Sequence, residues 1–234
     1  MPYYVTKAVA GPVLHMLWRP TVTGGENVPE SGGAIIASNH VSIADSLFLP
    51  LMVRRPVTFA AKAEYFTGTR LIDRATAAYL RRTRMLSVDR VGARAGQEML
   101  MSALRLLQVG QLFGIYPEGT RSPDGRLYRG RTGVGWLALA SGVPVVPVAM
   151  VGTDRVLPPG STRPHLGRVE VRIGKPLTFA ERFGEDARGS RPAKARREVT
   201  DEVMQAIQAL SGQEYTPMYA SDRKAELAAQ SRSG

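Results

Sequence analysis

A run of apolar residues at 145–151 (VVPVAMV) constrains the fold more than any other feature of the sequence. Its side chains do not alternate between polar and apolar, so the run predicts a strand that is covered on both faces. Such strands are typical of parallel sheets flanked by helices. The run is also far shorter than the roughly 20 apolar residues of a membrane-spanning helix.

The rest of the chain alternates short strands with helices. We expect further strands at 33–38, 56–61, 85–88, 111–116 and 169–173. Helical spacing of apolar residues predicts helices at 43–51, 71–80, 97–107, 134–141 and 198–210. This order predicts an α/β fold with a mainly parallel central sheet flanked by helices. Ligands in such folds bind at the carboxyl ends of the strands.

The composition excludes several kinds of site. The chain has no cysteine, which removes disulfide frameworks, thiolate nucleophiles and iron–sulfur clusters. Its three histidines, His15, His40 and His165, lie far apart and form no metal-binding pattern, so we expect no metal site. The formal net charge of +11 predicts an anionic partner, which could be nucleic acid, a membrane surface or a phosphorylated substrate.

The two ends of the chain differ in character from its middle. Residues 1–22 predict an amphipathic helical segment at a membrane interface, because Tyr3, Tyr4 and Trp18 flank an apolar stretch that also carries Lys7. The alternative is a helix packed on the domain's own core, and Pro12 is expected to interrupt a single continuous helix. Residues 23–212 are expected to form the main domain and 213–234 a C-terminal tail, whose polar residues 220–234 predict a frayed helix or a disordered segment.

A first candidate site follows the strand at 33–38. His40 and Asp45 are five residues apart, and they can meet only if His40 precedes a helix whose first turn holds Asp45. Ser42 supplies that geometry as an N-cap, with Asp45 three residues later in a capping box. Asp45 could then orient the imidazole of His40 and leave its other nitrogen free as a base. The alternative is that Asp45 only caps the helix and His40 is a loop residue.

A second candidate site follows the strand at 111–116. The loop at 114–121 (GIYPEGTR) resembles a phosphate-binding loop but lacks the lysine of a nucleotide-hydrolysing one. Gly119, Thr120 and Arg121 offer backbone N–H groups, a hydroxyl and a guanidinium, which suit a phosphate monoester. Arg131 and other arginines follow closely, so a solvated basic loop is the alternative.

These two sites together resemble those of the 1-acylglycerol-3-phosphate acyltransferase (lysophosphatidate acyltransferase) family. The resemblance covers roughly residues 24–175 and rests on four features in the same order as in the family. The matching stretches are 39–45 (NHVSIAD), 62–64 and 88–90 (KAE and VDR), 116–122 (YPEGTRS) and 143–148 (VPVVPV). The chain departs from the family pattern after 62–64, before 88–90 and at Arg131, where a lysine is common.

The resemblance implies transfer of a fatty acyl chain from an acyl thioester, acyl-CoA or acyl carrier protein, to the free hydroxyl of 1-acyl-glycerol 3-phosphate, which gives phosphatidate without a cofactor. His40 would be the general base and Asp45 its orienting group. Lys62 or backbone N–H groups would stabilise the oxyanion. The residues expected to bind the glycerol and phosphate are Glu118, Gly119, Thr120 and Arg121, with Arg90 and Arg131 as further contacts.

Several alternatives stay open within this resemblance. The acceptor could instead be glycerol 3-phosphate, 2-acyl-glycerol 3-phosphate, another lysophospholipid or a glycolipid, and Arg90 could simply pair with Asp89. A basic nucleic-acid-binding protein is disfavoured because no recognition motif is present. We expect a peripheral or monotopic protein on the cytoplasmic face of the cell membrane. Arginines at 70, 74, 81, 82, 84, 90 and 94 are expected to face an anionic membrane surface or the donor.

Overall fold

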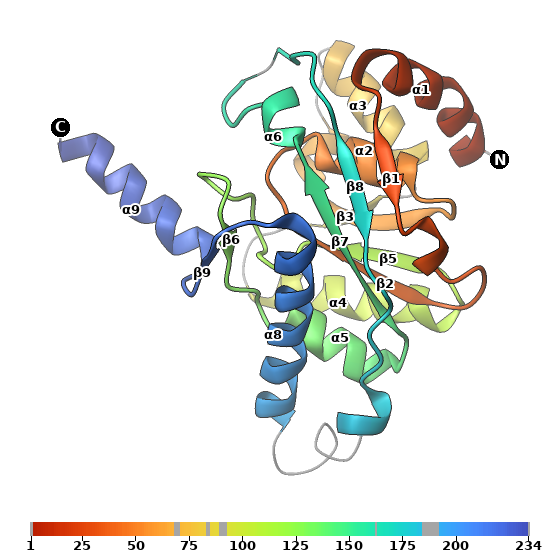
Figure 1. Cartoon of the computed structure of the whole chain (residues 1–234), viewed down its shortest axis with the longest axis vertical. Helices are drawn as coiled ribbons and strands as arrows, with labels where there is room; N and C mark the ends of the chain where they lie inside the picture. The colour runs from red at the N-terminus through yellow and green to blue at the C-terminus, as the bar shows by residue number, and fades with distance from the viewer. Residues whose placement is uncertain are drawn as a thin grey trace.

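The computed structural model describes residues 2–67, 71–82, 85–88, 93–161, 163–183 and 192–233. Its centre is a seven-stranded sheet in the order β1-β8-β7-β2-β5-β3-β4 (Figure 1). In that order the strands are β1 (Thr21–Thr23), β8 (Glu170–Ile173), β7 (Val145–Val151), β2 (Ala34–Ser38), β5 (Leu112–Ile115), β3 (Val57–Lys62) and β4 (Leu86–Val88). All neighbours are parallel except β7 and β8, which are antiparallel. The predicted mainly parallel sheet is therefore confirmed.

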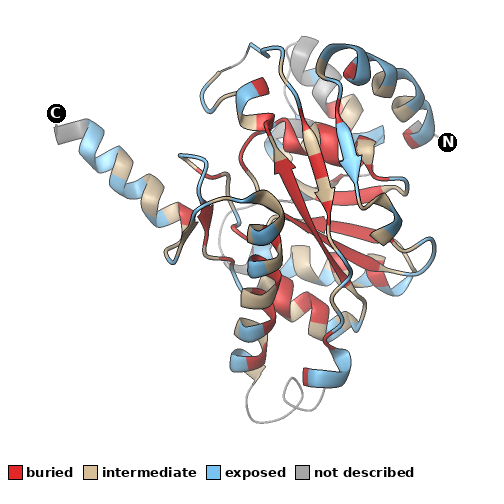
Figure 2. Cartoon of the chain, in the orientation of Figure 1, coloured by how far each residue is buried: buried red, intermediate tan, exposed pale blue. Residues whose placement is uncertain are grey.

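Helices cover both faces of the sheet, as the apolar central strands require. On one face lie α1 (Pro2–Trp18), α2 (Asp45–Met52), α3 (Leu71–Arg82) and α6 (Thr153–Val156). On the other lie α4 (Ala93–Gln108), α5 (Gly133–Ser141) and α8 (Pro192–Ser211). Each face of the sheet has its own hydrophobic core. Successive side chains of β2 point to opposite faces, so Ile36 packs in the core under α1, α2, α3 and α6, and Ile35 packs in the core under α4, α5 and α8. Figure 2 shows the buried residues concentrated in the sheet and on the helix faces against it.

Helix α1 differs from the sequence expectation because it runs through Pro12 without interruption. Contacts on both sides of Pro12 hold the two halves in line. Near the start the Tyr3 hydroxyl donates to the carbonyl of Pro50, and at the end the Trp18 indole donates to the carbonyl of His165 at 2.7 Å. These contacts stabilise the helix despite the hydrogen bond that proline removes. In the part of the chain that the structure describes, no helix is long and apolar enough to cross a bilayer.

After residue 212 the chain forms a short strand and a helix, so of the two alternatives expected for the last residues, a frayed helix or a disordered tail, the structure shows a helix at 220–233. The short strand β9 (Tyr215–Thr216) pairs in parallel with β6 (Leu127–Tyr128). Helix α9 (Ala220–Ser233) then projects away from the body of the molecule (Figure 1). The sequence did not predict the short strands β1, β6 and β9 or the 3-10 turns η1 (Gly25–Asn27) and η2 (Ala63–Phe66), because two to four residues are too few to show a period.

Candidate active site

The loop that follows β2 carries the first candidate site. Asn39 is buried and anchors the loop to β7, since its side chain accepts the N–H of Met150 at 2.8 Å and donates to the carbonyl of Met150 at 3.0 Å. The same amide also donates to the side chain of Gln213 at 2.8 Å. These bonds fix the backbone immediately before His40.

His40 and Asp45 meet as the sequence predicts. The Nδ1 atom of His40 lies 2.9 Å from Oδ2 of Asp45, whose side chain is fully buried. Oδ2 also accepts the backbone N–H groups of Val41 and Ser42, both at 2.8 Å, and Oδ1 accepts the hydroxyl of Thr153. Because a carboxylate can only accept, Nδ1 is the donor of this bond, and in the neutral imidazole the lone pair is therefore on Nε2. The arrangement supplies a base and its orienting group.

Ser42 does not cap α2 in the predicted way. The N-cap is Ala44, and α2 begins at Asp45 rather than one residue after Ser42. The Ser42 hydroxyl instead donates to the carbonyl of Leu157 at 2.7 Å and accepts the N–H of Ala44 at 3.1 Å. This side chain therefore tightens the turn and ties it to the segment after α6, while Asp45 still accepts the N–H of Ser42 as in a capping box.

A stack of aromatic rings supports the imidazole. The ring of Tyr116 lies 3.9 Å from that of His40 at an interplanar angle of 10°, and Phe59 lies 5.3 Å beyond it. The Tyr116 hydroxyl bonds to that of Ser46 at 3.1 Å, and burial beside Asp45 raises the pKa of Tyr116 well above its ordinary value. A Cβ at position 114 would overlap the ring of Phe59, so Gly114 is required there. The position of Tyr116 directly after β5, at the carboxyl end of a strand, was the feature of the sequence that placed it near the site.

Glu118 lies in a different environment from the one predicted. It is almost fully buried, and its two carboxylate oxygens accept the backbone N–H groups of His40 and Tyr128, both at 3.0 Å. Burial raises the pKa of Glu118 to about 7, although these two hydrogen bonds favour its charged form. In the structure Glu118 therefore connects the His40 loop to β6, and a contact between Glu118 and the acceptor stays a prediction.

The remaining residues of the second site lie around the same loop. Gly119 has a φ of +74°, which glycine adopts without strain, and a Cβ there would press on Arg131. Thr120 accepts a hydrogen bond from Lys224 of α9 at 2.7 Å. Arg121 is half-buried, and the exposed Arg131 donates to the hydroxyl of Ser221 at 3.0 Å. Sequence reasoning missed Lys224 and Ser221 because they are about 90 to 104 residues further along the chain.

Two predicted contacts and part of the arginine group cannot be placed. The backbone of Lys62 ends β3, but its side chain lies outside the described part, as does that of Arg94. Arg90, Asp89, Arg70 and Arg84 lie outside the described residues. The rest of the group, Arg74, Arg81 and Arg82, is exposed on α3.

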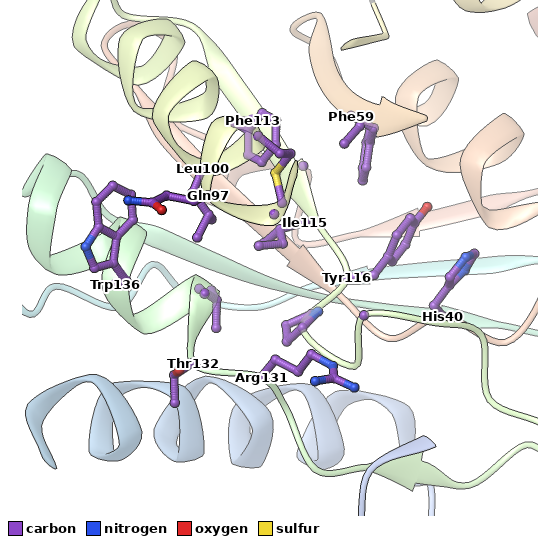
Figure 3. A pocket seen from close by; sticks show the side chains of 18 of the residues that line it. His40, Phe59, Gln97, Leu100, Phe113, Ile115, Tyr116, Arg131, Thr132 and Trp136 are labelled. Atoms are coloured by element: carbon purple, nitrogen blue, oxygen red, sulfur yellow. The ribbon is translucent and has the colours of Figure 1, made fainter. Parts of the chain in front are cut away.

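A pocket of about 840 Å³ opens beside His40. At one end it is lined by His40, Tyr116, Gly119 and Arg131, and at the other by apolar side chains of β5, α4 and α5. Figure 3 shows Leu100 and Trp136 at that far end and His40 at the opposite end, with Arg131 between them. The pocket therefore joins a base and a cation to a chamber with mostly apolar walls.

Comparison with known proteins agrees with this geometry. The Acyltransferase family matches residues 19–151, and the chain belongs to this family. It is 30% identical to the chloroplastic 1-acyl-sn-glycerol-3-phosphate acyltransferase LPAT1 of Arabidopsis thaliana over 177 residues, which is 75% of this chain and 48% of that one. The chain thus spans about half the length of this relative.

Two bacterial proteins match over more of their own length. The 1-acyl-sn-glycerol-3-phosphate acyltransferase of Bacillus subtilis is 28% identical over 67% of this chain and 72% of its own. The crystal structure of the 1-acyl-sn-glycerophosphate acyltransferase PlsC of Thermotoga maritima superposes with a TM-score of 0.65 at 26% identity, covering 88% of this chain and 80% of that one. The fold is thus that of this class of enzyme.

Proposed function

We propose that the protein transfers a fatty acyl chain from an acyl thioester to the free hydroxyl of 1-acyl-glycerol 3-phosphate, which forms phosphatidate. The observation that carries this proposal is the His40–Asp45 pair at the polar end of a pocket with an apolar far end. The names of the relatives support the choice of acceptor.

His40 is the general base of the proposed reaction. Its Nε2 takes the proton of the acceptor hydroxyl as the oxygen attacks the thioester carbonyl. The tetrahedral intermediate then collapses, the carbon–sulfur bond breaks, and the leaving thiolate recovers the proton from the imidazolium as a free thiol. Asp45 holds the proton on Nδ1 and stabilises the imidazolium between the two steps.

Direct attack by the acceptor fits the nucleophiles that the site offers. The sequence has no cysteine, and the Ser42 hydroxyl already donates to the carbonyl of Leu157. An acyl-enzyme intermediate on Ser42 would require this hydroxyl to leave its partner. We therefore assign no covalent intermediate to the reaction.

The pocket suggests where each part of the substrates lies. The apolar walls near Leu100, Phe113 and Trp136 suit a fatty acyl chain, because burying a methylene contributes about 0.8 kcal/mol. Arg131 lines the pocket, and Arg121 lies two residues after Gly119 on the adjoining loop, so these two guanidinium groups suit the acceptor's phosphate. Lys62 and Arg90 keep their proposed roles as an oxyanion donor and a phosphate contact.

The acceptor is tested by product analysis with the purified enzyme. One acyl-CoA is offered with 1-acyl-glycerol 3-phosphate, 2-acyl-glycerol 3-phosphate, glycerol 3-phosphate and a lysophosphatidylcholine in separate reactions. We expect phosphatidate from the first acceptor at the highest kcat/KM. A higher kcat/KM for another acceptor would mean that this compound is the acceptor of the same reaction. Repeating the series with acyl-acyl carrier protein in place of acyl-CoA identifies the donor.

We also propose that α1 attaches the protein to a membrane surface. Its buried residues face the domain, whereas Val5, Val9 and Met16 remain 61%, 68% and 73% exposed. Helix α3 lies next to α1 (Figure 1), and its Arg74, Arg81 and Arg82 are exposed. Apolar side chains next to basic ones suit an anionic leaflet such as the cytoplasmic face of the cell membrane.

Vesicle co-sedimentation tests this attachment. Replacing Val9 and Met16 with serine should lower binding to vesicles that contain anionic lipid, without changing the turnover of substrates dispersed in detergent. The matched control is Met101→Ser with Val109→Ser, which changes two exposed apolar residues in and just after α4, on the other side of the sheet. Unchanged vesicle binding by the α1 variant would contradict the proposal.

A further inference from the structure

The first turns of α9 lie against the loops of the active site. Tyr219, the residue before α9, has the guanidinium groups of Arg129 and Arg131 over its ring, at 5.6 and 5.0 Å from the centroid. Arg131 also donates to the hydroxyl of Ser221 at 3.0 Å. Together with the pairing of β9 and β6, these contacts fix the next turn of the helix, which carries Lys224.

Lys224 reaches the loop that surrounds His40. Its Nζ donates to the hydroxyl of Thr120 at 2.7 Å. Thr120 lies between two residues that bind the backbone of His40: Glu118 accepts its N–H at 3.0 Å, and Ser122 donates to its carbonyl at 2.7 Å. The ammonium group is therefore held at the same loop as the catalytic base.

Lys224 also lies close to a second cation. Burial lowers the pKa of Lys224 and the charge of Arg121 lowers it further, while the carboxylate of Glu118 raises it. Within the described part of the chain, neither cation has a carboxylate at ion-pair distance, since Glu118 is turned toward backbone N–H groups. Two cations and a hydroxyl brought together in this way favour an anionic ligand.

We propose that Lys224 completes, with Arg121 and Thr120, the subsite that binds the phosphate of the acceptor. This inference rests on the proposed function. It assigns a binding role to a segment that lies beyond residues 19–151, which match the Acyltransferase family. The proton transfer itself stays with His40.

The test compares Lys224→Met with Lys224→Arg in the full-length chain. A charged hydrogen bond to phosphate is strong enough that its loss should raise the KM for 1-acyl-glycerol 3-phosphate about 10- to 100-fold. The inhibition constant of glycerol 3-phosphate should rise by a similar factor. The KM for acyl-CoA should stay within about twofold, and Lys224→Arg should recover most of the lost affinity.

Lys175→Met is the matched control. Lys175 is exposed and follows β8. Because β8 runs antiparallel to β7, Lys175 lies at the amino-terminal end of β7, away from the carboxyl end where the site is. This variant makes the same change of charge and should keep both KM values.

Three outcomes would overturn the inference. An unchanged KM for the acceptor would show that Lys224 does not bind its phosphate, and a raised KM for acyl-CoA alone would assign Lys224 to the donor. If Lys224→Met lowers kcat with every acceptor and lowers the Tm, and Lys224→Arg restores neither, then Lys224 only holds α9 in place. If the wild-type enzyme acylates no phosphate-bearing acceptor, the proposed function fails. The subsite is then tested by the rise in Tm that glycerol 3-phosphate causes, which should be smaller in Lys224→Met than in wild type if Lys224 binds phosphate.

Discussion

The active site has two regions that are built in opposite ways. Around Asp45 every contact is buried and short, and three of its four donors come from the five residues before it. Around Arg121 the side chains are half-exposed, and they come from a loop, from the segment before α5 and from α9. The first region fixes one proton on one nitrogen, and the second gathers positive charge from distant parts of the chain. We therefore expect the first to set the rate of chemistry and the second to set affinity.

Among the groups around His40, the largest effect is expected from Asp45→Asn. An amide cannot hold the imidazole tautomer as a carboxylate does, so kcat should fall by roughly 10³-fold while the KM values change little. Steady-state kinetics measures both. Asp154→Asn is the matched control, because Asp154 is only half-buried on α6 and does not line the pocket. A small loss of kcat in Asp45→Asn would mean that the buried region does not govern the chemistry.

Arg121→Met should act on binding. Loss of a charged hydrogen bond is expected to raise the KM for the acceptor roughly 10- to 100-fold and to leave kcat nearly unchanged. Arg105→Met, an exposed arginine of α4 outside the pocket lining, provides the comparison. If Arg121→Met instead lowers kcat as strongly as Asp45→Asn, the two regions do not have separate roles.

Replacing Tyr116 tests how far ring stacking supports the base. Tyr116→Leu keeps an apolar side chain but removes the ring that stacks on His40 at 3.9 Å, so kcat should fall roughly 3- to 10-fold. Tyr116→Phe keeps the ring and loses only the bond to Ser46, so its kcat should stay close to that of wild type. Equal losses in both variants would assign the effect to the hydroxyl rather than to the stack.

Glu118 connects the two regions and should show the smallest effect, in the pH dependence of stability. Its pKa of about 7 in the folded protein exceeds its ordinary value of 4.5, so the native state binds more protons than the unfolded state between these pH values. The stabilising contribution of Glu118 is therefore present below pH 4.5 and is lost as the pH rises toward 7.

Urea denaturation of wild type and Glu118→Gln across this pH range tests the sign. The free energy of unfolding of wild type minus that of the variant should fall as the pH rises, by at most about 1.4 kcal/mol per pH unit. Glu181→Gln, an exposed glutamate, should show no such trend. A difference that grows with pH would mean that the neighbouring cations hold Glu118 as an anion.

The same contrast explains what the sequence could predict. The sheet, its flanking helices and the meeting of His40 with Asp45 follow from local patterns, because strand length, helix spacing and a five-residue separation are all visible in the chain. The contacts of Glu118 with the N–H groups of His40 and Tyr128 could not be predicted, because every residue type except proline carries a backbone N–H. Lys224 and Ser221 were missed because contacts between segments far apart in the sequence, such as the pairing of β9 with β6, bring them to the site. The continuity of α1 through Pro12 likewise depends on contacts with distant residues.

The role of His40 is tested most directly by the rate at which His40→Ala converts 1-acyl-glycerol 3-phosphate and acyl-CoA to phosphatidate, with both substrates saturating. Circular dichroism and the inhibition constant of glycerol 3-phosphate verify that the variant folds and still binds phosphate. If His40 is the base, phosphatidate formation falls by 10³-fold or more while the inhibition constant stays within about twofold of wild type. Turnover close to the wild-type rate would contradict the assignment of His40 as the general base.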